Sequence, residues 1–396
     1  MRKLINSLCL LLLATSIMAQ EDLTPWQYVK EYGNYISTGM PILSISPDAV
    51  SSALGDAGVA SEPDANSTHW NNAKYAFAEH KSGISTTYTP WLTNLGVSDM
   101  TLLYLSGFMK INDRSAIAAS LIYFSLGDIE NTNEMGDVLG QFHPNEFSFD
   151  LTYAMKLADH LSLGATGRFS RSDLTQGQNI GGTSTKAANA LSADVGLYYQ
   201  TNIDQKNEIA AGLHISNLGS KLRYSDDDTE SEFLPANLRL GARYTLRPDE
   251  YNKISFLLDA NKLLVPTRPI VGEDGEIAFG DVYADMNDYY QTGSIQGAIN
   301  SFFDAPAGLR EELAEFTLSA GAEYWYRETF AGRLGYFFEP DCKGGRQYLT
   351  LGLGLRYNIL QLDFSYLLPT VAVNKNPLSN TIRISLTVNF GKKKQQ

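Results

Sequence analysis

The sequence has no long apolar run and very little cysteine. No stretch reaches the roughly eighteen consecutive apolar residues of a membrane-crossing helix, so a helical membrane protein is excluded. The two cysteines are Cys9 and Cys342. Cys9 lies in a segment that we expect to be removed. The mature chain then keeps one thiol, which excludes an intramolecular disulfide.

Positive charge is also scarce. The 396 residues contain 31 Lys and Arg against 44 Asp and Glu, a formal net charge of −13. Nucleic-acid binding needs clustered basic residues, so nucleic acid is excluded as a partner. Four of the histidines have no metal-ligand spacing, namely His69, His80, His143 and His160. We therefore predict no cofactor and no metal held by histidine.

The N-terminus has the features of a secretory signal peptide. Arg2 and Lys3 supply a charged start, and Leu4 to Ala14 form a short apolar core. Small residues then lead to a cleavage site before Gln20. We predict that residues 1–19 are the signal peptide and are removed on export.

Strict alternation of apolar and polar residues marks the C-terminal end. From Thr381 to Phe390, every second residue is apolar and its neighbours are polar. Alternate side chains of a strand point to opposite faces, so one face is apolar and the other polar. A tilted strand of about ten residues crosses a bilayer. The segment ends in an aromatic residue, Phe390, and so resembles the last strand of a Gram-negative outer-membrane barrel.

The same pattern recurs in about fourteen segments, an even number, as single-chain bacterial barrels require. They are 83–90, 100–109, 114–125, 147–157, 160–170, 189–200, 207–216, 236–246, 252–261, 316–327, 329–339, 347–358, 360–368 and 381–390. Short connections alternate with long ones, which predicts periplasmic turns and external loops. A soluble all-β sandwich gives no reason for this sorting. We predict an all-β fold, a transmembrane antiparallel β-barrel of about fourteen strands.

The chain divides accordingly into a plug and a wall. We predict the barrel over 83–390, with a long external loop at 262–315 and a short tail at 391–396. Residues 20–82 do not alternate, and they include a predicted short helix from Pro47 to Leu54. The lumen of a barrel this size is wider than its own side chains fill. Residues 20–82 are therefore a predicted hatch inside or beneath the barrel.

The hatch carries a family resemblance. Ala53 to Ala60 reads Ala-Leu-Gly-Asp-Ala-Gly-Val-Ala, and Asp64-Ala65 and Trp70-Asn71-Asn72-Ala73 follow. This order resembles the hatch of the FadL-like outer-membrane proteins, although Asn72 stands where that family has proline. The implied hatch residues are Gly55, Gly58, Asp64, Trp70, Asn71 and Asn72.

Over nearly its whole length, the chain is similar to the FadL-like barrels of the type IX secretion system. Most of that match lies between Ser46 and Ala73. The resemblance implies a non-enzymatic outer-membrane component that binds secreted cargo proteins with a C-terminal signal domain. Such a component takes cargo from a large outer-membrane translocon. It passes the cargo to a sortase-like attachment complex, which joins it to lipopolysaccharide.

Two external segments are candidates for binding. In loop 262–315, Ile295, Ile299, Phe302 and Phe303 are spaced as one face of a helix. They predict either a platform for cargo or lipid, or a lid packed on the barrel mouth. The acidic run Asp226, Asp227, Asp228, Glu230 and Glu232 could bind calcium or a basic partner surface. A solvated loop is the simpler interpretation.

Two other functions remain open. A FadL-type transporter of fatty acids or other hydrophobic small molecules would need an apolar lumen near the hatch. A lipid A deacylase would rest on His214 and Ser216, but their strand positions place both toward the lumen, where we expect a hydrogen-bonded pair.

Charged and aromatic residues of the wall complete the prediction. The predicted lumen ladder comprises Arg168, Arg239, Arg243, Arg333, Arg356, Asp150, Asp194, Asp259, Glu323 and Asp363. The predicted aromatic girdles comprise Tyr198, Tyr199, Tyr324, Trp325, Tyr326 and Tyr336.

Overall fold

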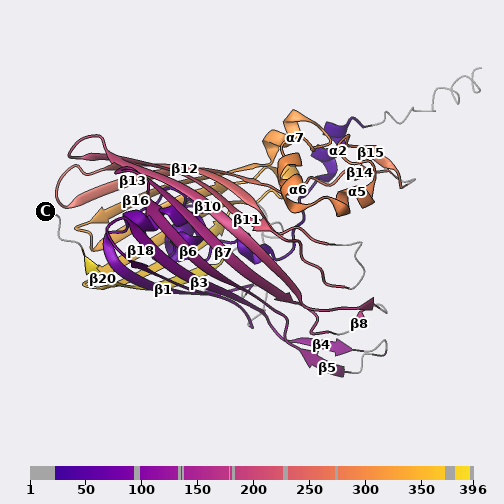
Figure 1. Ribbon diagram of the computed structural model, residues 1–396, viewed down its shortest axis with the longest axis horizontal. Helices are drawn as coiled ribbons and strands as arrows, with labels where there is room; N and C mark the ends of the chain where they lie inside the picture. The colour runs from indigo at the N-terminus through magenta and orange to yellow at the C-terminus, as the bar shows by residue number, and fades with distance from the viewer. Residues whose placement is uncertain are drawn as a thin grey trace, which may run out of the picture.

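Fourteen antiparallel strands close into one barrel in the computed structural model (Figure 1). The structure describes residues 23–92, 99–132, 135, 138–177, 179–180, 183–225, 231–272, 275–370 and 380–392. The barrel strands are β1 (His80–Pro90), β2 (Met100–Lys110), β3 (Ser115–Leu126), β6 (Asn145–Lys156), β7 (Leu161–Asp173), β10 (Ala188–Asn202), β11 (Asn207–Gly219), β12 (Asn237–Leu246), β13 (Asn252–Leu263), β16 (Phe316–Tyr326), β17 (Phe330–Phe338), β18 (Gln347–Tyr357), β19 (Leu360–Pro369) and β20 (Ile382–Lys392). β1 pairs with β20 and closes the ring. The predicted all-β barrel is confirmed, and each predicted segment overlaps one strand.

Burial alternates along the strands in the sense that a membrane wall requires. In β18, Leu349, Leu351 and Leu353 are 40%, 45% and 67% exposed, whereas Thr350 between them is 0% exposed. The apolar side chains therefore point outward and the polar ones into the filled lumen, as in barrels that face lipid. Among the residues that the structure describes, no helix is long and apolar enough to span a membrane.

The connections are sorted by length between the two ends of the barrel. Strands join through two to five residues at one end and through longer segments at the other. This confirms the predicted sorting, and the short turns mark the periplasmic end. Three external loops contain hairpins too short to predict: β4 (Ile129–Thr132) with β5 (Val138–Phe142), β8 (Asn179–Ile180) with β9 (Thr183–Ser184), and β14 (Ile270–Val271) with β15 (Ile277–Phe279).

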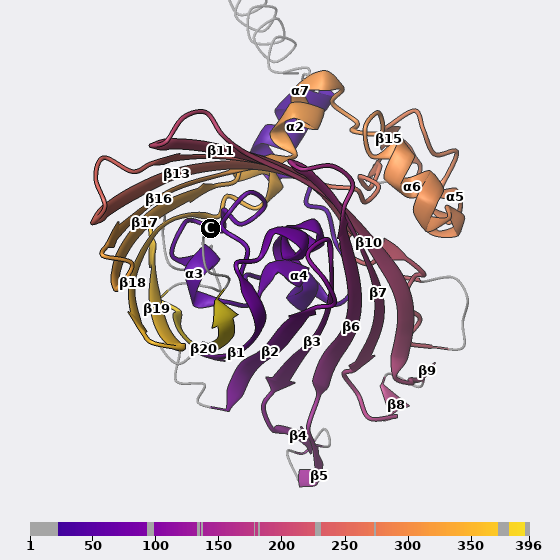
Figure 2. The same ribbon diagram turned by 60° about the vertical axis from the view of Figure 1, so that its left-hand side comes forward.

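The segment before β1 runs through the barrel. Its elements are α2 (Pro25–Tyr32), η1 (Pro41–Ser44), α3 (Ala49–Ser52), α4 (Ser67–Trp70) and η2 (Asn72–Phe77). Figure 2 shows α3 and α4 enclosed by the ring of strands. We call Pro41–Phe77 the hatch. α3 is shorter than the predicted helix 47–54. Asp48 caps its start by accepting from the Ser51 N–H, and Gly55 and Asp56, with φ values of 69° and 64°, prevent the helix from continuing.

Helices gather at the external end (Figure 1). The long loop forms α5 (Met286–Gln291), α6 (Ser294–Asn300) and α7 (Leu309–Ala314). α2 packs beside α7 and beside η4 (Asp341–Lys343), a turn between β17 and β18. We call residues 264–315, together with α2 and η4, the collar.

The predicted girdles are wrong at two positions. Tyr198 is 0% exposed and Trp325 is 2% exposed, so both lie in the lumen. Their neighbours Tyr199, Tyr324 and Tyr326 are about 40% exposed and face outward. Adjacent residues of a strand point to opposite faces, so a run of aromatics cannot all face lipid.

Candidate functional site

The hatch is held against the wall by backbone groups and small residues. The N–H groups of Gly58 and Val59 donate to Oδ2 of Asp259 in β13, at 2.7 and 2.9 Å. The N–H of Gly55 donates to Oγ1 of Thr350 at 2.9 Å. A Cβ at Gly55 would lie 2.5 Å from the backbone of β17. Only glycine permits this close approach.

The predicted hatch residues Trp70, Asn71 and Asn72 lie within the same barrel. Trp70 donates through Nε1 to Oδ2 of Asp48 at 2.6 Å, which joins two parts of the hatch. Asn71 donates to the carbonyl of Leu197 at 2.9 Å. Asn72 donates to Oγ1 of Thr166 at 2.9 Å. These two amides bind the hatch to strands β7 and β10.

Wall glycines make room for these amides. A Cβ built on Gly164 or Gly196 would lie 2.4 Å from Oδ1 of Asn72. Asp64 accepts from Oγ of Ser67 at 2.9 Å and so shapes the turn before α4. Hatch and wall therefore form one packed interior.

Two wall arginines each bridge two carboxylates, as the predicted ladder requires. The pairs are Arg168–Asp150 (2.7 Å), Arg168–Asp194 (2.9 Å), Arg333–Glu323 (2.7 Å) and Arg333–Asp363 (2.8 Å). Every member is at most 8% exposed. Such pairing is what offsets the desolvation of buried charge.

The other predicted members lie on the lumen side, but their predicted pairing with each other is wrong, because they bind other groups. Asp259 accepts from hatch amides, and Arg239 donates to the carbonyl of His69 at 2.7 Å. Arg356 donates to Oε1 of Gln361 at 3.0 Å. The sequence shows which residues face the lumen, but it does not show that the hatch supplies the partners of Asp259 and Arg239.

Arg383 is a hatch anchor that the sequence analysis missed. It is 1% exposed, and it donates to the carbonyl of Ser46 at 3.0 Å and to Oγ of Ser52 at 2.8 Å. The alternation of β20 places Arg383 on the lumen face, which was the available signal. Its partners lie more than 300 positions away in the chain and could not be predicted.

His214 and Ser216 face the lumen, as their strand positions predicted. His214 is 0% exposed and Ser216 is 3% exposed, so neither reaches the lipid face. The predicted hydrogen bond between them is wrong. Within the described part of the chain, neither ring nitrogen of His214 nor Oγ of Ser216 has a hydrogen-bond partner. A lipid-cleaving pair needs access to lipid and a base bonded to its nucleophile, so the geometry disfavours a deacylase.

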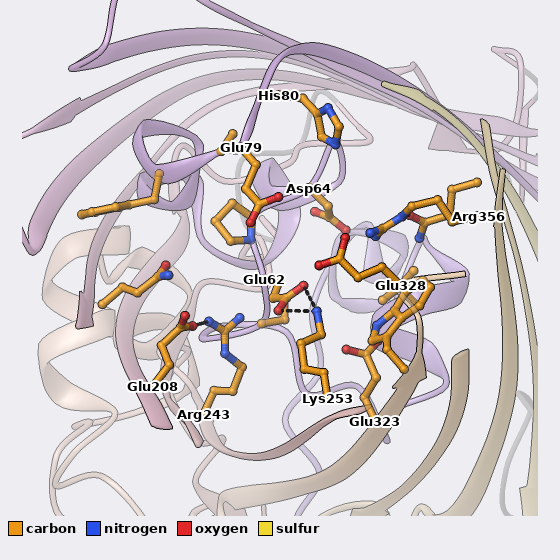
Figure 3. A pocket seen from close by; sticks show the side chains of 18 of the residues that line it. Glu62, Asp64, Glu79, His80, Glu208, Arg243, Lys253, Glu323, Glu328 and Arg356 are labelled. Atoms are coloured by element: carbon orange, nitrogen blue, oxygen red, sulfur yellow. Dashed lines mark hydrogen bonds and ion pairs between the residues drawn. The ribbon is translucent and has the colours of Figure 1, made fainter. Parts of the chain in front are cut away.

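A polar cavity of about 520 Å³ lies between the hatch and the periplasmic turns. Figure 3 shows its charged lining, which includes Glu62 from the segment after α3 and Lys253 from β13. Their ion pair spans 2.8 Å. Arg243 and Glu208 form a second ion pair across this lining. The cavity offers an apolar small molecule little favourable contact.

A second buried charge cluster fixes the collar to the barrel mouth. Lys343 contacts Glu311 at 2.7 Å and Glu315 at 3.0 Å, and Lys262 contacts Glu312 at 3.2 Å and also Glu315. Each of the five residues is at most 9% exposed. The cluster links β13, α7 and η4, and so holds the collar in a defined position.

The predicted platform residues belong to the collar and are exposed. Ile295, Ile299, Phe302 and Phe303 are 68%, 55%, 39% and 76% exposed. The first two lie on α6 and the last two follow it. They do not form a buried lid over the barrel mouth. Their role as cargo contacts stays a prediction.

Most of the acidic run, for which a solvated loop was the simpler interpretation and calcium binding an alternative, lies outside the described residues. Only Glu232 of that set is described, and its backbone pairs with Leu222. Among the residues that the structure describes, no group of three or more His, Cys, Asp and Glu side chains could hold a metal ion.

A closed fourteen-strand barrel filled by its own N-terminal segment defines a FadL-like outer-membrane barrel. The crystal structure of the Pseudomonas putida toluene transporter TodX is similar, with a TM-score of 0.50 and 10% identity. That alignment covers 87% of this chain and 99% of TodX. A Pseudomonas aeruginosa FadL homologue aligns with 90% of this chain and all of its own, at 11% identity and a TM-score of 0.44. At such identities the likeness to TodX shows the fold alone.

Within this class, the family is given by the sequence. The family model described as "Type IX secretion system protein PorV" matches residues 28–270, more than half of the chain. The chain therefore belongs to the PorV family and is an outer-membrane barrel of type IX secretion. No curated protein sequence matches it.

Proposed function

We propose that this protein binds secreted cargo with C-terminal signal domains at its external end. It would take the cargo from the large translocon and deliver it to the sortase-like attachment complex. The family match over residues 28–270 carries this proposal. The hatch supports it, because Asp259, Arg383 and Asn72 bind the plug across the lumen. A filled lumen leaves the external surface, and not the pore, for binding a folded protein.

The test is native purification from outer membranes in mild detergent, followed by mass spectrometry of the proteins and lipids that stay bound. We expect secreted proteins that share a C-terminal domain, together with a giant barrel or a sortase-like protease. Purification from cells that lack the translocon is the control for cargo specificity. A lumen lipid with no protein partner would contradict the proposal.

A transporter of hydrophobic small molecules is the second candidate. The fold of TodX, described as a toluene transporter, favours it. The charged lining of the periplasmic cavity opposes it, since Glu62, Lys253, Arg243 and Glu208 are poor contacts for an apolar molecule. Uptake of a labelled fatty acid by vesicles that contain the barrel separates the two functions. We expect no uptake above that of empty vesicles.

We also propose that export removes residues 1–19 and that the mature chain comprises an N-terminal segment that contains the hatch, the barrel and a short tail. The strands run from His80 to Lys392, so the expected bounds of 20–82, 83–390 and 391–396 shift by two or three residues. The apolar core from Leu4 to Ala14 supports the cleavage. The intact mass of the protein from outer membranes tests it. We expect the mass of a chain that begins at Gln20, and the full-length mass would contradict the proposal.

A further inference from the structure

Helix α6 lies on the outer side of the barrel wall, not across its mouth. Its buried Ala298 packs with Leu264, and Ile215 of β11 and Leu238 of β12 pack against the same cluster. The strand neighbours of these two, His214 and Arg239, are buried in the lumen. Because adjacent strand residues face opposite ways, Ile215 and Leu238 point out of the barrel, toward the lipid side. The helix therefore covers the outer face of β11 and β12.

The residues after α6 continue along this outer face. The Phe302 ring lies 5.6 Å from Nζ of Lys262, and the Phe316 ring lies 5.7 Å from the same atom. Lys262 and Phe316 are directly paired across β13 and β16. They share a face with the outward Leu258 and Leu318, which are 59% and 45% exposed. Phe302 thus lies at the external edge of the lipid-facing wall.

The free side of α6 is apolar and uncharged. Ile295 and Ile299 are four positions apart and so share one helix face. Residues 294–303 contain no Asp, Glu, Lys or Arg. Gln296 and Asn300 bond to each other at 2.7 Å, which forms the polar side. Phosphate headgroups need cations, so an uncharged Ile and Phe surface selects acyl chains instead.

We propose that this face, formed by Ile295, Ile299 and Phe303, sits in the outer leaflet and binds lipid acyl chains. Its continuity with the lipid-facing wall at Phe316 and Leu318 carries the inference. α6 then acts as an interfacial helix that fixes the collar at the level of the membrane surface. The inference is independent of the cargo-shuttle role, and cargo contact at these residues is the rival outcome of its test.

The test uses tryptophan substitutions and vesicles of phosphatidylcholine whose acyl chains carry bromine, a contact quencher. The variants Phe303→Trp and Ile299→Trp are made in the full chain and reconstituted. Three of the four native tryptophans are at most 6% exposed, so the unchanged protein gives the background. Leu240→Trp, on the outward face of β12, is the positive control. Gln296→Trp, on the polar side of α6, is the matched control.

We expect Phe303→Trp and Ile299→Trp to lose as large a fraction of emission as Leu240→Trp, and Gln296→Trp to lose much less. Both test positions are more than half exposed, so the substitutions leave the core unchanged. Quenching at both positions no greater than at Gln296→Trp would overturn the inference. Removal of the quenching by added cargo would overturn it as well, because cargo, and not lipid, would then be the molecule that binds this face.

Discussion

At the scale of single residues, the fit between hatch and wall depends on glycines, which have no side chain. Gly164 of β7 faces Asn72 and the backbone of Ala73, and a Cβ there would lie 2.4 and 2.5 Å from them. Real Cβ atoms do not approach so closely, so either the hatch or the strand must move. Gly167, on the same strand, has nothing within 4 Å of a built Cβ. The pair gives a matched comparison.

We predict that Gly164→Ala loosens the hatch, at a cost of about 1–3 kcal/mol in barrel stability by overpacking. Hydrogen exchange of residues 71–76, and the temperature at which the barrel loses its folded gel mobility, measure the effect. Gly167→Ala should match the unchanged protein in both. Equal behaviour of the two variants would show that the hatch does not press on Gly164.

Asp304 sets a pH dependence in the collar. It is 3% exposed and accepts from the Tyr283 hydroxyl at 3.0 Å and from the Thr267 N–H at 3.2 Å. In the described part of the chain, its Oδ1 has no hydrogen-bond partner. Burial raises the pKa of Asp304 to about 6. Because this is above the unfolded value of about 3.9, folding favours the protonated form. Its stabilising effect is complete below about pH 4 and is lost as pH rises through about 6.

We predict that Asp304→Asn stabilises the collar above pH 6, by an amount on the order of 2 kcal/mol, and leaves it unchanged near pH 4. The uncharged amide still accepts from Tyr283 and Thr267. Limited proteolysis of residues 264–315 between pH 4 and 8 measures the difference. Asp281→Asn, at an exposed collar position, is the control. It should leave the rate of proteolysis unchanged both near pH 4 and above pH 6. A pH-independent effect of Asp304→Asn would contradict the assignment.

At the scale of elements, the charged bridges decide whether neighbouring strands keep their places. Arg168 in β7 contacts Asp150 of β6 and Asp194 of β10, so one guanidinium joins three strands. Removing it leaves two buried carboxylates without their cation. An uncompensated buried charge is far more destabilising than the loss of an exposed pair.

We predict that Arg168→Met destabilises the barrel by about 3–5 kcal/mol, which heat-dependent gel mobility and chemical unfolding would show. Arg171→Met is the control on the same strand, because its pair with Asp173 spans 3.4 Å and its side chain is 40% exposed. That change should cost no more than about 1 kcal/mol. Similar losses in the two variants would mean that burial of the bridge does not matter.

At the scale of the whole molecule, the chain enters the barrel from outside. Asn34, just after α2, donates its N–H to the carbonyl of Cys342 at 3.0 Å and its side chain to Glu311 at 3.0 Å. Both partners belong to the external collar. The hatch then passes through the lumen, and β1 begins at His80, which pairs with Lys392 at the periplasmic end. The segment that contains the hatch is therefore held at both ends of the barrel.

We predict that an epitope inserted directly before Thr24 is labelled by antibody on intact cells. The same epitope placed directly after Lys392 should be labelled only after the outer membrane is permeabilised. Flow cytometry of both constructions measures the difference. An epitope at Thr24 that is hidden until permeabilisation would contradict the external position of α2.

Much of this architecture was predictable because its signals are local. Alternation from Thr381 to Phe390 depends on neighbouring residues alone, and loop lengths follow from the strand ends. The hatch residues Gly55, Trp70 and Asn72 were expected from a family resemblance, which a short continuous stretch can carry. Which wall groups hold them was not, because Asp259 and Arg383 are about 200 and 330 positions distant.

The sequence by itself determined the class of wall, the count of its strands and the end at which its long loops lie. Each of these follows from a period of two residues and from the spacing between periodic segments. Only the tertiary structure decided that α6 folds back onto the outer face of β11 and β12, and that Asp259 and Arg383 hold the hatch. Those outcomes depend on contacts between segments that lie far apart in the chain. A pattern of neighbouring residues does not indicate which distant segments come into contact.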